Sequence, residues 1–461
     1  MSLYIINRFC ITIRFLKMLF FDGKINKDLS FSLLALFSKN RYSTHISNQE
    51  FLKNMPSILA DRLQRIQPSP TLALNAKANA LKAQGIDVIN LAAGEPDFET
   101  PVWVQQAAVQ SMEQGMTKYT AVDGIPALKK AIQQKFMRDN NIEYDLDQLI
   151  VSNGGKHVIF NALMASINDG DEVLIPAPYW VSYPDMVNLF GGVSKTVACS
   201  EANGFKLTAD QLRQAITPKT KWLILNSPSN PTGAMYTIAE LKALAEVLVE
   251  NHHVYIMSDD IYEHLVYDGH KFATLAQIEP RLKLRTLIVN GVSKSYSMTG
   301  WRIGYGAGPK ELIKAMTMIQ SQSTSNPCSI AQGAAVMALN GPHGFLKEWC
   351  ESFAERRDAT LQALNKIEGL SCRKPEGAFY LYVNCAGILD KVTPGGEVLE
   401  TDNQFCAYLL EHARVTAVSG DAFGLSPYFR ISYATSMQNL MEACNRIKEA
   451  VSALKPQANA A

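Results

Sequence analysis

Charge of one sign and long apolar runs are both missing from this 461-residue chain. Its 44 Lys and Arg side chains balance 43 Asp and Glu, so the net charge of +1 gives no argument for a nucleic-acid or membrane-surface partner. Charged residues interrupt the apolar stretches of the N-terminal region before any reaches about 18 residues, so no transmembrane helix is predicted. The eight cysteines form no CxxC pair and no metal-type spacing, which indicates a reduced, cytosol-like compartment and no metal site.

The first 54 residues differ in composition from the rest. They are basic, poor in acidic residues and contain serines, which is typical of a mitochondrial transit peptide, here one that would end near residues 41–44. We favour the alternative that translation begins at Met55, since residues 55–63 look like a natural start. Residues 1–54 are therefore excluded from fold prediction. We expect a cytoplasmic protein, or a mitochondrial one if the transit peptide is real.

Helices and short strands alternate after Met55. Helical spacing predicts helices over 57–63, 71–84, 101–115, 125–140 and 156–167. Apolar runs predict strands over 88–91, 149–151, 172–175, 221–225, 254–257 and 287–289. Because these runs are continuous rather than alternating, the strands are expected to be buried on both faces of a mostly parallel sheet. Ligands bind such sheets beyond the carboxyl ends of the strands, so the polar turns there are the place to look for chemistry.

The pattern changes near residue 344. A charged helix over 347–367 is followed by strand-like segments at 378–383, 415–418 and 429–433, and by a last helix at 438–454. The chain also exceeds the usual size of a single core. Together these features predict a large α/β domain followed by a smaller α+β domain.

Lys294 follows an apolar run, 286–289, that predicts a buried strand. A lysine at such a position loses solvation, its pKa falls, and a neutral amine can form a Schiff base with an aldehyde. Arg302, eight residues later, offers a planar fork of donors suited to phosphate. An aldehyde that carries a phosphate is pyridoxal 5'-phosphate. The alternative is a surface lysine and arginine around a glycine-rich loop.

Other strand ends carry groups that could contact the same cofactor. Gly154 and Gly155 precede a helix whose N-terminal amides could bind phosphate, or they form a plain tight turn. Asp259 could pair with a pyridinium N–H, or cap a helix that begins at residue 261. Tyr262 could reach the 3'-oxygen of the same ring, or merely pack.

Three further aromatic or polar residues have two readings each. Asn230 lies in a rigid turn, 226–233, that could aim its amide at a phenolate oxygen, or it belongs to an ordinary loop. Trp180 could stack on a flat ring or fill the core. Tyr119 could contact a phosphate or be an exposed loop tyrosine.

Arg430 stands inside an apolar strand. A buried arginine needs a partner, either the carboxylate of a substrate or an internal salt bridge.

With these motifs in order, the chain resembles the class I, fold-type I aminotransferases over residues 55–454. The lysine segment, the Asn-Pro turn, the Asp-x-x-Tyr step and the Phe-Arg-Ile-Ser-Tyr strand all fit. Segments 178–184 and 298–305 are similar to the bacterial branch of aspartate and aspartate/prephenate aminotransferases. The resemblance implies an extension at 1–54, an N-terminal arm and part of the small domain at 55–100, a large cofactor-binding domain at 101–343, a C-terminal small domain at 344–454 and a tail at 455–461.

The resemblance also implies roles. Lys294 would carry the cofactor and then shuttle a proton, Arg430 would bind the α-carboxylate with help from the backbone of Gly94, and Lys156 would bind a distal carboxylate. Trp180 and Asn230 would contact both cofactor and substrate. The other implied cofactor contacts are Gly154, Gly155, Lys156, Asp259, Tyr262, Ser293, Arg302 and, across a homodimer interface, Tyr119.

The implied reaction is ping-pong transfer of an amino group from L-aspartate to 2-oxoglutarate. Two departures stand out: His157 replaces a usual glutamine, and Gln67 replaces a lysine frequent in prephenate-active members. Alternatives are a prephenate or aromatic aminotransferase and a cofactor-dependent C–S lyase. A non-enzymatic regulator would need a DNA-binding module, and residues 1–54 show no helix-turn-helix pattern.

Overall fold

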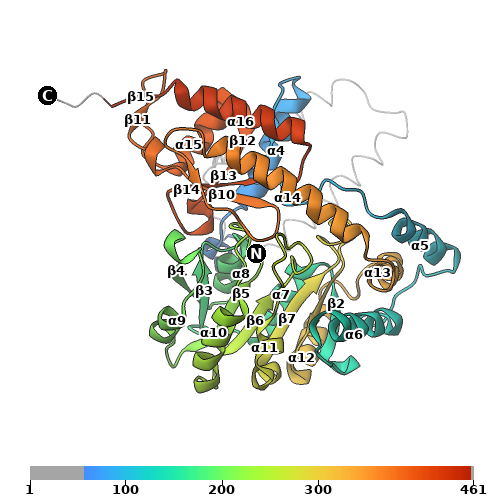
Figure 1. Ribbon diagram of the computed structural model, residues 1–461. Coiled ribbons are helices and arrows are strands. Elements are labelled where there is room, and N and C mark those ends of the chain that lie inside the picture. Colours follow the sequence, from blue (N-terminus) through green and yellow to red (C-terminus); the bar gives the residue numbers. More distant parts are fainter. Residues whose placement is uncertain (1–56, 458–461) are drawn as a thin grey trace, which may run out of the picture. The chain divides into compact units, whose positions relative to one another are not determined.

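The computed structural model describes residues 57–457. Residues from Asp61 onward form one compact unit, and the description below concerns that unit (Figure 1). The predictions made for residues 1–54 lie outside the described residues. Within 57–457, no helix has the length and apolar character needed to cross a bilayer. The predicted cytoplasmic location stays a prediction.

A seven-stranded sheet dominates the large part of the fold. Neighbouring strands are parallel except at β8, which runs antiparallel to β2 and β7. The predicted mostly parallel sheet is therefore confirmed. In spatial order the strands are β2 (Leu149–Ser152), β8 (Gly304–Ala307), β7 (Thr286–Gly291), β6 (Tyr255–Asp259), β5 (Thr220–Asn226), β3 (Glu172–Ala177) and β4 (Val193–Ala198).

Helices cover both faces of this sheet, as the continuous apolar runs predicted. On β7, Leu287 and Val289 join one apolar cluster, while Ile288 between them joins another. A third cluster packs β5 and β6 against α10. The helices of this part are α5 (Val102–Glu113), α6 (Pro126–Asn140), α7 (Gly155–Ser166), α8 (Ser182–Leu189), α9 (Ala209–Ala215), α10 (Ile238–Glu250), α11 (Leu275–Ile278), α12 (Lys310–Ser321) and α13 (Ser329–Asn340).

A smaller antiparallel sheet is formed mainly by the C-terminal part, in the order β13 (Val418–Ser419), β14 (Tyr428–Ser432), β10 (Tyr380–Asn384) and β9 (Ser371–Cys372). The N-terminal segment pairs with this part of the chain in a separate two-stranded sheet, in which β1 (Ile89–Asn90) runs parallel to β12 (Val415–Thr416). Within the predicted tail, β15 (Lys455–Pro456) pairs with β11 (Lys391–Val392). The helices here are α4 (Pro70–Ala83), α14 (Phe345–Leu364), α15 (Asp402–Tyr408) and α16 (Met437–Ser452).

Two predicted elements are wrong. The helix expected at 57–63 is replaced by a short 3₁₀ turn, Asp61–Arg65, none of whose residues is buried. A short segment that buries none of its residues gains too little from packing to offset the cost of helix nucleation. The strand expected at 415–418 is two strands, β12 and β13, which belong to different sheets. Elsewhere the predicted helices and strands overlap the observed ones and differ mainly at their ends, where helices fray.

Two strands of the large sheet were not predicted. β4 is half-exposed and lacks a continuous apolar run. β8 contains Gly304 and Gly306, residues that normally weaken a strand. Here they are required: a Cβ at Gly304 would overlap the backbone of Gly154 and Gly155, and one at Gly306 would lie 2.8 Å from Val158 Cγ1.

A buried ion pair supports the turn after β6. The ammonium of Lys135 on α6 is fully buried and contacts the carboxylate of Glu263. The side-chain amides of Asn140 and Asn290 donate to the same carboxylate over 3.0 and 2.7 Å. The pair therefore ties α6, the turn after β6 and the end of β7 together.

Replacing Lys135 with alanine would leave the Glu263 carboxylate buried without its cation. We expect Lys135→Ala to lower the free energy of unfolding by about 3–5 kcal/mol. Urea unfolding measures this loss. Lys130→Ala, at an exposed position of the same helix, is the control and should change stability by less than about 0.5 kcal/mol. Equal losses in both variants would contradict this account.

Candidate functional site

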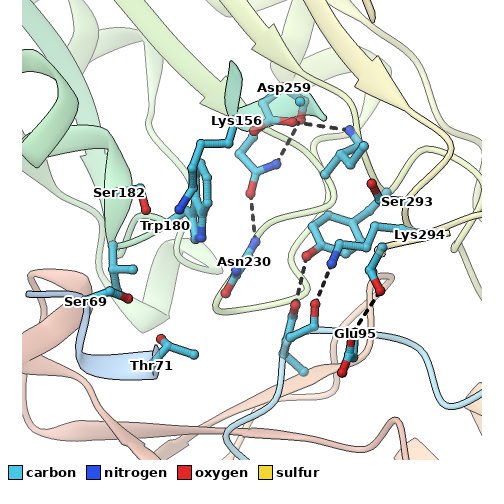
Figure 2. Close-up of a pocket in the computed structure, with 18 of the residues that line it drawn as sticks. Ser69, Thr71, Glu95, Lys156, Trp180, Ser182, Asn230, Asp259, Ser293 and Lys294 are labelled. Atoms are coloured by element: carbon cyan, nitrogen blue, oxygen red, sulfur yellow. Dashed lines mark hydrogen bonds between the residues drawn. The ribbon is translucent and has the colours of Figure 1, made fainter. Parts of the chain in front are cut away.

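A cavity of about 420 Å³ lies at the carboxyl ends of the large sheet's strands and is closed by residues of α4, the 93–95 segment and the small sheet (Figure 2). Most of the predicted site residues line it. Those that do are Gly94, Gly155, Lys156, Trp180, Asn230, Asp259, Tyr262, Ser293, Lys294, Arg302 and Arg430. Gly154 lies directly beneath Arg302. Tyr119 does not line the cavity and is 90% exposed.

Lys294 follows the end of β7, and its ammonium donates to the carbonyl of Gly94 (Figure 2). Burial lowers the pKa of Lys294 to about 8, and the nearby cations Arg302 and Arg430 lower it too, against the opposing effect of Glu95. A larger share of the amine is therefore neutral near pH 7 than in an ordinary lysine. The site offers an amine able to attack a carbonyl carbon.

Asp259 is the last residue of β6 and is 6% exposed. Burial raises the pKa of its carboxyl to about 6, although a 2.6 Å hydrogen bond from the Tyr183 hydroxyl and the charge of Lys294 act in the other direction. No helix begins at residue 261, because the chain turns there and the next helix is α11. The helix-cap reading of Asp259 is therefore wrong.

Arg302 and the first turn of α7 form a cradle for an anion. Arg302 donates to the carbonyls of Thr299 and Asn153 over 2.8 and 3.2 Å. A Cβ at Gly154, whose φ of +88° also favours glycine, would lie 2.9 Å from Arg302 Cζ. The guanidinium can thus lie against the helix N-terminus of α7, where backbone amides favour phosphate.

Arg430 on β14 is 2% exposed. Its guanidinium donates to Asn230 Oδ1 over 2.8 Å and to Ala92 O over 2.7 Å, and both partners are neutral. Its Nε has no hydrogen-bond partner among the described residues. The internal salt bridge considered from sequence is not formed within 57–457, so the buried cation has capacity for an incoming carboxylate.

Lys156, Trp180 and Tyr262 complete the walls. The ammonium of Lys156 lies 4.8 Å from the ring centre of Trp180. Burial lowers the pKa of Lys156, as does Arg302, while Asp185 raises it. The hydroxyls of Tyr262 and Tyr380 lie 2.8 Å apart.

The two departures from the family pattern have defined surroundings. His157 Nδ1 accepts a 3.3 Å hydrogen bond from the backbone N–H of Asn153, at the start of α7. Burial raises the pKa of Asp185 and the backbone of Gln67 acts against this, while Asp185 in turn raises the pKa of Lys156. The hydrogen bond from Asn153 to His157 therefore supports the backbone that enters α7.

Sequence reasoning missed three residues that shape the site. Asn226 donates to Asp259 O and accepts from the backbone N–H of Asn230, each over 2.8 Å. Its place at the start of the Asn-Pro turn was the available signal. Tyr183 follows Trp180 by three residues, one helical turn, which could have suggested a shared face. Tyr380 carried no signal beyond a strand-like run.

A buried lysine and an anion cradle lie at the strand ends of the large sheet, and β14 of the small sheet adds an arginine that has no carboxylate partner within residues 57–457. This arrangement is that of an enzyme of amine–carbonyl chemistry. The sequence profile of the family "Aminotransferase class I and II" matches residues 86–447, and the chain belongs to this family. Its fold is that of the fold-type I aminotransferases. Members of the family work with pyridoxal 5'-phosphate and act on amino and oxo acids.

Individual relatives agree. The "Probable aspartate/prephenate aminotransferase" of Rickettsia bellii is 59% identical over 86% of this chain and 100% of that protein. The "Aspartate aminotransferase" of Rhizobium meliloti is 57% identical over 85% of this chain and 95% of that protein. The crystal structure of the aspartate aminotransferase from Rhizobium meliloti superposes with a TM-score of 0.84 at 56% identity, covering 87% of this chain and all of that one. The resemblance deduced from sequence is confirmed.

The lowered pKa of Lys294 can be measured directly. In cofactor-free protein, arylation by fluorodinitrobenzene reports the neutral amine, and the Lys294 peptide should reach half-maximal rate near pH 8. An ordinary lysine would do so at about 10.4. Because burial disfavours the charged form, the proton leaves at lower pH. Lys294→Ala identifies the peptide, and a midpoint near 10 would refute the shift.

Proposed function

We propose that the protein transfers the amino group of L-aspartate to 2-oxoglutarate, giving oxaloacetate and L-glutamate, with pyridoxal 5'-phosphate as cofactor. The observation that carries the proposal is the placement of Lys294 in one cavity with two further cations, Arg430 and Lys156. A dicarboxylic amino acid needs two cationic contacts and a base near its α-carbon, and this cavity offers all three.

The residues present fit the cofactor. Arg302, Gly154, Gly155 and Ser293 would hold its phosphate, since the cradle at the start of α7 is suited to an anion. Asp259 would accept a hydrogen bond from its ring nitrogen. When bound, the cofactor supplies an aldehyde that condenses with amines and a ring that withdraws electrons from the carbon losing its proton.

Two aromatic residues and an amide would contact the ring of the cofactor. Trp180 would lie against its face, and Asn230 and Tyr262 would donate to its 3'-oxygen. Tyr119 is assigned to the phosphate bound by a partner subunit in a homodimer. Its 90% exposure in the single chain is compatible with a role across an interface.

The side chains of this cavity would perform the reaction as follows. Arg430 binds the α-carboxylate of the amino acid, with the backbone at Gly94 beside it, and Lys156 binds the distal carboxylate. These contacts fix the direction of the Cα–H bond. Nζ of Lys294 removes the proton from Cα of the amino acid. It later delivers a proton to the same face of the substrate. A pKa of about 8 suits a group that must take up and release a proton near neutral pH.

Prephenate is the second candidate amino acceptor. The relative from Rickettsia bellii carries both substrates in its name. Gln67 stands where prephenate-active relatives often have lysine, so prephenate is expected to be the poorer acceptor here.

The primary test combines chemistry on Lys294 with substrate comparison. Purified protein supplied with cofactor should be yellow, and borohydride should attach the chromophore to Lys294. Lys294→Ala should lower aspartate–2-oxoglutarate turnover by at least about 10³-fold, because the variant lacks the amine assigned to move the Cα proton. Lys242→Ala, at an exposed position, is the control.

Rates with aspartate, prephenate, phenylalanine and cystathionine then separate the alternatives. A colourless, inert preparation after addition of cofactor would refute the proposal. Dominant cystathionine cleavage would replace it with a C–S lyase.

Lys156→Ala tests the distal contact. Loss of a charge-assisted hydrogen bond should raise KM for aspartate by about 10–100-fold. The amino acid alanine has no distal carboxylate, so KM for alanine as the substrate should change by less than about threefold in the same variant. Steady-state kinetics with both amino acids measure the difference. Equal losses, or unchanged aspartate kinetics, would remove Lys156 from this role.

A further inference from the structure

We propose that Tyr183 is a positioning residue: its hydroxyl fixes one oxygen of the Asp259 carboxylate and keeps that group ionised and aimed at the cavity. The inference rests on the proposed function, in which Asp259 holds the ring nitrogen of the cofactor. It assigns to Tyr183 the task of keeping that nitrogen protonated.

One carboxylate oxygen of Asp259 accepts a short hydrogen bond, and the other can still accept one. Oδ2 accepts the Tyr183 hydrogen bond over 2.6 Å. Oδ1 has a single long contact, 3.4 Å, with the backbone N–H of Ile261. The backbone of Asp259 is itself held, because Asn226 Nδ2 donates to its carbonyl over 2.8 Å. A carboxylate anchored in this way can still accept a strong hydrogen bond through Oδ1.

The direction of the Tyr183 hydrogen bond follows from charge. Burial, and next the neighbouring Asp259, hold the pKa of Tyr183 well above its usual value, so the phenol stays protonated and must donate. Both side chains are more than nine-tenths buried. The contact is therefore a charge-assisted hydrogen bond shielded from water.

Removing this donor would change the state of the carboxyl group. Burial already raises the pKa of Asp259 to about 6, and the Tyr183 hydrogen bond is the largest effect opposing burial. The other charged or titratable groups facing this pair are Lys294, which lowers the pKa of Asp259, and Tyr262 and Asp260, which raise that of Tyr183. Without the hydroxyl, the carboxyl would take up a proton at a higher pH, and a neutral carboxyl has no negative charge to favour a protonated ring nitrogen.

Tyr183 is also tied to the wall that faces the ring. Its aromatic ring packs edge-to-face on Trp180, with centroids 5.3 Å apart. Trp180 lies in the turn just before α8, Tyr183 is the second residue of that helix, and both line the cavity. The backbone N–H of Tyr183 donates to Trp180 O over 3.0 Å, so the entry into α8 would place both the stacking surface and the support of Asp259.

The test uses the holoenzyme reconstituted with cofactor labelled with ¹⁵N in the ring. In the wild type, the ¹⁵N chemical shift should be that of a protonated pyridine at neutral pH. In Tyr183→Phe, which keeps the aromatic ring, it should move toward the neutral-pyridine value. We expect kcat for aspartate to fall about tenfold, the effect of one hydrogen bond to a charged group, while KM changes less than about twofold.

Tyr408→Phe is the matched control. The Tyr408 hydroxyl is buried in the C-terminal part and donates to Ala450 O over 2.8 Å, and neither residue lines the cavity. The Tyr408→Phe variant should lose about as much stability as Tyr183→Phe, with no change in the ¹⁵N shift. An unchanged shift in Tyr183→Phe, or equal shifts in both variants, overturns the inference.

Two further measurements keep the outcomes separate. Borohydride fixation on Lys294 is carried out on every variant, because failure in the wild type would refute the proposed function and not the role of Tyr183. If Tyr183→Phe does not fold, Tyr183→His, which can offer an N–H to Asp259, is compared with wild type. A ring nitrogen that remains protonated there supports the inference, and a neutral one overturns it.

Discussion

Burial of positive charge without matching negative charge is the constraint on which this site depends. Lys294 and Arg430 line one cavity with Asp259. Within the described residues, all hydrogen-bond partners of the Arg430 guanidinium are neutral. Helices cover both faces of the sheet and leave its strand ends as the place where polar groups meet. The cavity therefore favours a ligand that brings negative charge, which a phosphate and a carboxylate supply.

Close backbone approach is the means by which the charges come together. Arg302 can lie against the start of α7 because Gly154 has no side chain, and β8 can pass beneath that point because Gly304 has none. A glycine that would weaken an ordinary strand is here the condition for an anion cradle.

The sequence predicted the chemistry better than the boundaries. Lys294, Asp259 and Arg430 stand out because charged residues next to buried apolar runs need a reason to be there. The same reasoning could not find β8, whose glycines carry no apolar signal, or separate β12 from β13. Tyr183 was also beyond it, since a tyrosine that supports a carboxylate cannot be told from a packed one until the hydroxyl is located. The domain boundaries and the contribution of Tyr119 stay predictions.

The pairing of β1 with β12 joins segments more than 300 residues apart in the chain. During synthesis, every strand of the seven-stranded sheet has been made once β8 is complete, whereas β1 has no partner until much later. Arg430 follows later still. A nascent chain can thus form the lysine side of the cavity first and add Arg430 only after the later segments have been made.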